Sequence, residues 1–226
     1  MKIYNHIMEK TSSSFAYKTL KENILRLDMK PGEEIKEAEV LHALNMSRTP
    51  VREAMILLRH DGLIETVSQS GTFVSKIDKE KFNDGRLLRL AVEEKIILKA
   101  CEDFPEEYMK KLEANLEKQK RIMETSRDYV EFHYADLEFH KIIFEGAGHR
   151  SLFEITNSEF FDYQRMRVIF CADKIRDDFV YNGHREFYKI IKEKRKEDVA
   201  KTLYAHLNQL AEKFDSFVEE YPEYFK

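Results

Sequence analysis

The sequence predicts a mainly α-helical protein of two domains that contains one short β-hairpin. Three observations lead to this prediction. Only seven glycines and four prolines occur among the 226 residues, so few positions interrupt regular structure. Apolar residues recur at three- and four-residue intervals through most of the chain, which is the spacing of one face of a helix. Residues 63–74, in contrast, alternate apolar and polar side chains around a turn that contains glycine.

Residues 1–76 are expected to form the first domain. Three helices are predicted here, over residues 14–27, 36–44 and 48–60. Ser47 suits the N-cap of the third helix, and Pro50 falls in its first turn, where a backbone donor is not needed. The segment "SQSG" then joins two short strands, with Gly71 at the tip of the turn. Three helices followed by a hairpin form the pattern of a winged helix-turn-helix domain.

The third predicted helix has an apolar face and a basic face. The apolar face anchors the helix and consists of Val51, Ala54, Met55 and Leu58. The basic face lies about a quarter turn away and consists of Arg48, Arg52 and Arg59. An arginine near the start of a groove-entering helix can donate two hydrogen bonds to guanine O6 and N7. The alternative is a solvated helix whose arginines pair with Glu53 or Asp61.

The residues expected to contact double-stranded DNA are Ser47, Arg48, Thr49, Arg52, Ser70 and Gly71. The two arginines are predicted to read base edges, Ser47 and Thr49 to contact phosphate or base, and the hairpin residues to lie near the minor groove. Residues 1–76 hold 11 Lys/Arg against 10 Asp/Glu, whereas residues 77–226 hold 27 against 32. Affinity for phosphate must therefore come from local placement of cations rather than from bulk charge.

Three motifs of this region, "SRTPVREA", "DGLIE" and "SGTFV", follow one another at specific spacings. In this order they resemble the N-terminal domain of the GntR superfamily of bacterial transcription regulators. The resemblance implies a winged helix-turn-helix that binds an operator. Relatives often carry an arginine in the second helix that helps to hold DNA. This chain has Ala38 at that place, with Lys36 as the neighbouring cation.

Residues 77–226 are expected to form the second domain, an all-helical bundle joined to the first near residues 75–81. Six helices are predicted, over residues 78–101, 106–125, 128–146, 151–172, 175–194 and 197–220. Asp78 and Asp128 suit N-caps, and Pro105 suits the first position of a helix. The apolar pattern lacks a sustained heptad, which favours a compact bundle over an extended coiled coil. Its phenylalanines are expected to form the core.

Four residues of this second domain have the chemistry of a metal site. Asp136 and His140 stand one helical turn apart, so one ion can contact both side chains. His184 and His206 lie on two later predicted helices. One carboxylate and three imidazoles suit Zn²⁺, Ni²⁺ or Mn²⁺ better than Ca²⁺, which prefers oxygen ligands. Spacing alone leaves open that Asp136 and His140 form only a surface pair.

The segment "YADLEFHKIIFEGAGHRSLFEI" contains a D-x-x-F-H motif and resembles the effector-binding FCD domain of the FadR branch of the same superfamily. The resemblance implies that Asp136, His140, His184 and His206 bind a divalent transition metal. His133 could replace Asp136 by geometry, but the family pattern does not use it.

The same resemblance implies a small carboxylate as the effector. Arg89, in "RLAVEE", matches the family's R-x-x-L-E position and is the first candidate to pair with that carboxylate. Arg165 and Arg167 are weaker candidates, and both are expected to form salt bridges that face solvent.

Together these features predict a ligand-responsive transcription regulator, more specifically a repressor that binds a pseudo-palindromic operator as a homodimer. One recognition helix per chain covers only a half-site, which is why two chains are expected. Two alternatives remain open on the sequence. One is a regulator whose metal site is purely structural, and the other is a metalloenzyme in which the metal activates water.

Two further features concern the compartment. Cys101 and Cys171 lack the spacing of a metal-binding pair and are predicted to be buried reduced thiols, as in a reducing compartment. Apolar runs do not approach the roughly 20 residues that a membrane span needs, and a charged-then-apolar leader is not recognisable. The sequence therefore predicts a cytoplasmic protein without a membrane partner.

Overall fold

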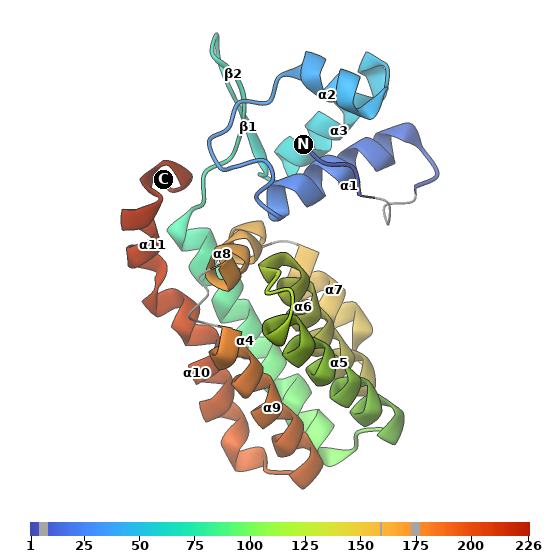
Figure 1. Ribbon diagram of the computed structural model, residues 1–226, viewed down its shortest axis with the longest axis vertical. Helices are drawn as coiled ribbons and strands as arrows, with labels where there is room; N and C mark the ends of the chain where they lie inside the picture. Colours follow the sequence, from blue (N-terminus) through green and yellow to red (C-terminus); the bar gives the residue numbers. More distant parts are fainter. Residues whose placement is uncertain (5–8, 159, 173–176) are drawn as a thin grey trace. The chain divides into compact units, whose positions relative to one another are not determined.

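The computed structural model of this chain describes residues 1–4, 9–158, 160–172 and 177–226 (Figure 1). The chain forms two compact units. The first unit combines Met1–Lys79 with Ser216–Lys226, and the second comprises Glu80–Asp215. The sequence-based division into residues 1–76 and 77–226 therefore differs from the observed one chiefly at the C-terminus, whose last residues pack with the N-terminal unit.

The first unit is a winged helix-turn-helix, as predicted. Its elements are α1 (Ser12–Leu25), α2 (Glu37–Leu44), α3 (Arg48–His60), β1 (Ile64–Val67) and β2 (Gly71–Val74). Helix α1 packs on α3. The fully buried apolar side chains of these two helices are Ala16, Leu20, Ile24, Val51, Ala54 and Leu58. Helix α1 begins two residues before its predicted start because the Thr11 hydroxyl accepts a hydrogen bond from the backbone N–H of Ser14.

The wing is a two-stranded antiparallel sheet in which Val67 pairs with Gly71. Three residues therefore form the turn, and the prediction that Gly71 lies at its tip is wrong. Gln69 adopts the left-handed backbone conformation at the tip of the turn, with a φ of 63°. Gly71 begins β2 with a φ of 136°, a conformation that other residues rarely adopt, and a Cβ there would lie 3.3 Å from the Glu34 carboxylate.

The C-terminal segment joins the first unit through backbone hydrogen bonds. It consists of the end of α11 (Phe214–Glu220), the 3₁₀ helix η2 (Pro222–Tyr224) and the last two residues. The N–H of Ile77 donates to the carbonyl of Tyr224 at 2.8 Å, and the N–H of Lys226 donates to the carbonyl of Ile77 at 3.1 Å. The Phe225 ring is 4% exposed. This pairing explains why residues 216–226 belong to the N-terminal unit.

Phe225→Ala is expected to weaken the N-terminal unit specifically. Removing a buried phenyl ring typically lowers the free energy of unfolding by about 3–5 kcal/mol. Hydrogen exchange followed by mass spectrometry can measure protection in the two units separately, and we expect faster exchange around Ile77 with an unchanged second unit. Glu223→Ala, which truncates an exposed neighbour, is the control. Equal exchange in the two variants would mean that the segment contributes no stability.

The second unit is an all-helical bundle, as predicted. Its elements are α4 (Lys79–Glu102), α5 (Glu106–Glu124), α6 (Tyr129–Gly146), α7 (Arg150–Ser158), α8 (Phe161–Ala172), α9 (Asp177–Glu193), η1 (Lys196–Asp198) and α10 (Val199–Glu212). Helix α5 packs on α6 and α9, α6 also packs on α7 and α8, and α9 packs on α10. Phe139, Phe144 and Phe187 lie in the apolar core between them. The Asp128 carboxylate caps α6 as predicted, accepting from the N–H groups of Val130 and Glu131.

Two predicted helices are each divided in the structure. Residues 151–172 form α7 and α8, and Phe160 and Tyr163 contact Gly85 of α4, where an added Cβ would lie 2.7 Å and 2.9 Å from their Cβ atoms. Residues 197–220 form η1, α10 and α11, because the chain leaves the bundle after Asp215 to join the first unit. Pro105 lies at the N-cap of α5 rather than at the first helical position, with an extended ψ of 139°. The predicted helix start at residue 175 lies outside the described residues.

Two further features are the burial of the cysteines and the length and polarity of the helices. Cys101 and Cys171 are both buried thiols that form no disulfide among the described residues, as expected. Within the described ranges, every helix is too short or too polar to cross a bilayer.

Candidate metal and DNA-binding sites

The second unit brings together the four residues that the sequence proposes as metal ligands. Asp136 and His140 come from α6, His184 from α9 and His206 from α10. Each of them offers one ligand atom, and these atoms all lie within 4.8 Å of one another. Residues that are 44 and 22 positions apart along the chain therefore converge on one point. We call these four residues the ligand cluster.

The Asp136 carboxylate lies at the centre of the ligand cluster. Its Oδ1 is 3.1 Å from Nε2 of His184 and 3.6 Å from Nε2 of His140. Its Oδ2 accepts a hydrogen bond from the Arg167 guanidinium. Asp136, His140 and His184 are 4%, 2% and 0% exposed and lie in the interior of the bundle, whereas His206 is only partly buried. One carboxylate thus faces the imidazoles with one oxygen and an arginine with the other.

The donor set fits a transition metal ion. His140 Nε2 and His206 Nδ1 are buried, and neither forms a hydrogen bond with a described residue. Leaving such atoms unpaired is unfavourable in a protein interior unless another partner satisfies them. Three imidazoles and one carboxylate are ligands that Zn²⁺, Ni²⁺ and Mn²⁺ accept. The cluster could therefore hold such an ion without rearrangement of its helices.

Gly183 allows the His206 ring to approach. A Cβ at position 183 would lie 2.6 Å from Nδ1 of His206, closer than real side chains come. Glycine is therefore needed beside His184 for α9 and α10 to present their histidines to the same point. The sequence analysis did not identify this role, because Gly183 lies inside a helix and no local feature distinguishes it.

The protonation states in the cluster suit metal binding. Burial lowers the pKa of His184 to about 4, although Asp136 opposes the shift. Burial and the neighbouring histidines also lower the pKa of His206 well below its ordinary value. Burial opposes ionisation of Asp136, but Arg167 and the two imidazoles outweigh it, and its pKa lies well below the ordinary value. At neutral pH the imidazoles of His184 and His206 are therefore uncharged and the Asp136 carboxylate is ionised. These are the forms that bind metals.

Polar side chains also contact the far nitrogens of two imidazoles. His184 Nδ1 hydrogen-bonds with Oε1 of Gln119 at 2.8 Å. His140 Nδ1 lies 2.9 Å from Oε2 of Glu93, whose other oxygen pairs with Arg89. Histidine ligands usually have such partners, which orient the ring. Gln119 and Glu93 were not identified from the sequence, where the only signal is that Glu93 stands one turn after Arg89.

His133, the alternative that the sequence raised, is buried at 4% exposure. Among the described residues, the group able to hold one ion comprises Asp136, His140, His184 and His206, without His133.

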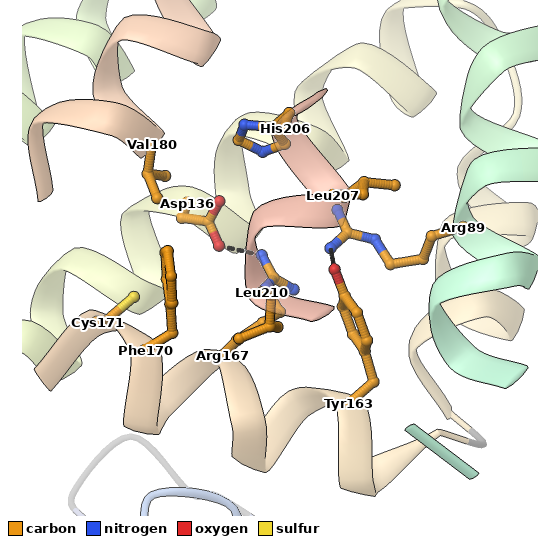
Figure 2. A pocket seen from close by; sticks show the side chains of 10 residues that line it. All are labelled: Arg89, Asp136, Tyr163, Arg167, Phe170, Cys171, Val180, His206, Leu207 and Leu210. Carbon is orange, nitrogen blue, oxygen red and sulfur yellow. Dashed lines mark hydrogen bonds and ion pairs between the residues drawn. The ribbon is translucent and has the colours of Figure 1, made fainter. Parts of the chain in front are cut away.

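A small cavity adjoins the ligand cluster (Figure 2). Its lining consists of Arg89, Asp136, Tyr163, Arg167, Phe170, Cys171, Val180, His206, Leu207 and Leu210. The cavity measures about 30 Å³, which is enough for at least one ordered water molecule. The guanidinium groups of Arg89 and Arg167 point into the same region. Arg167 donates to Asp136, and Arg89 donates to the Tyr163 hydroxyl at 3.1 Å.

The three candidate arginines are all buried. Arg89 is 4%, Arg165 0% and Arg167 6% exposed. The prediction that Arg165 and Arg167 form solvent-facing salt bridges is therefore wrong. Both instead pair with carboxylates inside the bundle, Arg165 with Asp162 and Arg167 with Asp136. Burial opposes the charge of Arg89, but Glu93 and the Tyr163 hydroxyl more than compensate and raise its pKa above the ordinary value.

In the first unit, the residues proposed to contact DNA lie at the surface. Ser47, Arg48, Thr49 and Arg52 are exposed at the start of α3, and Ser70 is exposed in the turn of the wing, next to a half-buried Gly71. Ser47 occupies the N-cap position, but its hydroxyl forms no capping bond with any described residue of α3. Arg52 pairs with Glu37 of α2 at 3.1 Å rather than with Glu53 or Asp61. The start of α3 thus presents two guanidiniums and two hydroxyls to its surroundings.

Two family models match this chain. The model described as "Bacterial regulatory proteins, gntR family" matches residues 12–74, which cover α1 to β2. The FCD domain model matches residues 86–209, which include the ligand cluster and Arg89. The second match alone spans more than half of the chain.

Two relatives that match most of the chain are also named as HTH-type transcriptional regulators or repressors. The chain is 25% identical over 209 residues to the HTH-type transcriptional repressor RspR of Escherichia coli K12, covering 92% of this chain and 91% of that protein. It is 25% identical over 204 residues to the uncharacterized HTH-type transcriptional regulator YdhC of Bacillus subtilis, covering 90% and 91%.

Solved structures share the fold. E. coli McbR/YncC superposes with a TM-score of 0.75 at 18% identity, covering 92% of this chain and 100% of that one. Lar, which controls expression of the Listeria monocytogenes agr system, superposes with a TM-score of 0.59 at 19% identity, covering 90% and 96%. The order of the helices, the ligand cluster and the two family matches all indicate the same family. The chain belongs to the GntR family of bacterial transcription regulators, with an FCD domain as its effector-binding part.

Proposed function

We propose that this chain is a homodimeric repressor that binds a pseudo-palindromic operator and releases it when a small carboxylate enters a metal-centred pocket. The observation that carries the proposal is the convergence of four ligand atoms within 4.8 Å beside a cavity lined by two buried arginines. The relative RspR is named as a repressor, which supports the sign of regulation. The proposal also assigns the protein to the bacterial cytoplasm, where its operator would be.

DNA recognition is assigned to the start of α3 and to the wing. Arg48 and Arg52 would read base edges in the major groove, while Ser47 and Thr49 would contact phosphate or base. Ser70 and Gly71 would approach the backbone near the minor groove. Because each chain contributes one α3, two chains are needed to read both halves of a pseudo-palindrome.

The metal site is assigned to Asp136, His140, His184 and His206, with Zn²⁺, Ni²⁺ or Mn²⁺ as the ion. When bound, such an ion would supply a Lewis-acidic centre with room for a carboxylate oxygen in addition to the four protein ligands. The residues around it would complete the effector site. Arg89 and Arg167 would offer positive charge to a second carboxylate oxygen, and the Tyr163 hydroxyl would hold the Arg89 guanidinium in place.

The size of the cavity indicates how the signal would begin. A volume of about 30 Å³ is small for a ligand pocket, so side chains would have to move to admit an effector larger than a few atoms. The lining comes from α4, α6, α8, α9 and α10. Helix α4 starts where the first unit ends, and α10 leads through α11 into residues that belong to the first unit. Both covalent connections between the units therefore continue from helices that line the pocket.

Binding to a selected operator tests the proposal. Operator affinity would be measured with metal-loaded and chelator-stripped protein, each titrated with a panel of mono-, di- and hydroxycarboxylates. We expect one acid to lower the affinity of the loaded protein by about 5- to 150-fold, the range of ordinary allosteric coupling. The stripped protein should respond much less. Equal responses of loaded and stripped protein would contradict a metal-centred effector site.

The small cavity also favours a second candidate, a regulator in which the metal only stabilises the bundle. That candidate predicts that stripping lowers the unfolding temperature, while no carboxylate changes operator affinity in either form. The same titration therefore separates the two functions.

A further inference from the structure

Two buried amide side chains of α5 connect the backbone of α6 to the imidazole of His184. Asn115 and Gln119 stand one helical turn apart and are 6% and 0% exposed. Asn115 Nδ2 donates to the carbonyl of Ala135 at 3.0 Å, and Gln119 Nε2 donates to Asn115 Oδ1 at 2.6 Å. Gln119 Oε1 in turn lies 2.8 Å from His184 Nδ1, in hydrogen-bond geometry.

The direction of this hydrogen-bond chain is fixed at the Ala135 end. A backbone carbonyl can only accept, so Asn115 must turn its NH₂ group toward it. Asn115 Oδ1 then accepts from Gln119, and Gln119 Oε1 is left to accept from His184. Reversing both amides would set two acceptor oxygens 3.0 Å apart without a proton between them, which is strongly unfavourable in a buried site.

We infer that Asn115 and Gln119 are positioning residues that hold His184 in the tautomer protonated at Nδ1, so that Nε2 presents a lone pair to a divalent transition metal. The inference rests on the proposed metal site, but it gives a role to two residues outside the ligand cluster. It also explains why polar amides are buried where α5 packs on α6 and α9.

The amide chain acts against a competing acceptor. Asp136 Oδ1 lies 3.1 Å from His184 Nε2, and as a carboxylate it would accept a hydrogen bond from that nitrogen if the nitrogen carried the proton. The neutral ring has one proton and an acceptor on each side. Without Gln119, the proton would move to Nε2, where it would block the nitrogen that faces the ligand cluster. Gln119 keeps that nitrogen ready to bind a metal.

Two substitutions at Gln119 in the full-length protein test the inference. Gln119→Leu removes the acceptor at similar volume, and we expect about 10- to 100-fold weaker Zn²⁺ binding, the usual effect of losing the partner of a ligand histidine. Gln119→Glu keeps an acceptor for Nδ1 and, with its other oxygen protonated, still donates to Asn115 Oδ1, so it should retain affinity to within about threefold. Asn23→Leu removes a fully buried amide of the first unit and should bind Zn²⁺ as the parent does. Affinity would be measured by competition with a chromophoric chelator.

The tautomer itself would be measured by ¹H–¹⁵N correlation of the imidazole signals, with His184 assigned from the signals lost in a variant lacking it. In the metal-free parent we expect the proton on Nδ1, in Gln119→Glu the same, and in Gln119→Leu a shift to Nε2. A proton on Nε2 in the metal-free parent would overturn the inference even if a variant failed to fold. Equal loss of affinity in both Gln119 variants would also overturn it, since it would mean that the amide serves only packing. A parent that binds no metal would refute the proposed function, while the tautomer measurement would stay valid.

Discussion

Replacing His184 by alanine is expected to lower the affinity for a divalent transition metal by more than about 100-fold. Loss of a residue that merely supports a ligand weakens binding about 10- to 100-fold, and loss of a ligand should exceed that range. His184 is fully buried, and its ring stacks on Phe139 with centroids 4.2 Å apart. Its removal therefore takes one of the four ligand atoms out of a packed interior site. Metal content after dialysis and chelator competition measure the effect.

The same variant should separate metal sensing from DNA binding. The affinity of metal-stripped protein for the operator should match that of the parent, because α3 and the wing belong to the other unit. Any response to a carboxylate effector should be strongly reduced. His60→Ala, which removes an imidazole whose side chain is 87% exposed, is the control and should bind metal normally. Equal metal stoichiometry in His184→Ala and the parent would refute His184 as a ligand.

The sequence could predict the first unit well because its signals are local. A residue suited to an N-cap, an early proline and helical periodicity each act over a few positions, and they placed α2 and α3 within one residue of the observed bounds. The tip of the wing was misassigned because Gln69, not a glycine, adopts the left-handed conformation at the tip of the turn. Pairing between Ile77 and the C-terminal segment could not be predicted, since nothing in either stretch specifies a partner at the other end of the chain.

The candidate metal site was only partly visible in the sequence. Asp136 and His140 could be paired from helix geometry alone, but His184 and His206 were joined to them through the family resemblance rather than through spacing. Arg167 was expected at the surface because arginines are rarely buried unless paired. Its partner, Asp136, lies 31 residues away on another helix. Gln119 and Gly183 acquire their roles only from tertiary contacts, which local patterns cannot specify.

Arg52→Ala is expected to reduce discrimination between operator and random DNA. A bidentate contact to a base typically contributes about 1–3 kcal/mol of discrimination, which corresponds to about 5- to 150-fold per half-site, and a dimer would lose it twice. In the free protein Arg52 pairs with Glu37 at 3.1 Å, with side chains 62% and 38% exposed. An exposed pair of this kind is worth at most about 1 kcal/mol, so breaking it on binding does not cancel the gain.

Two further variants distinguish base reading by Arg52 from simple attraction to phosphate. Arg52→Lys keeps the charge but loses the planar fork, so it should discriminate as poorly as Arg52→Ala while keeping the dependence of affinity on salt. Arg59→Ala removes the same charge from the exposed last turn of α3, far from the end that reads bases, and should preserve discrimination. Affinities for operator and random duplexes across a salt series supply both quantities. If Arg52→Ala kept the parent's ratio of these affinities at every salt concentration, Arg52 would contact phosphate or nothing, and base reading would have to be reassigned to Arg48.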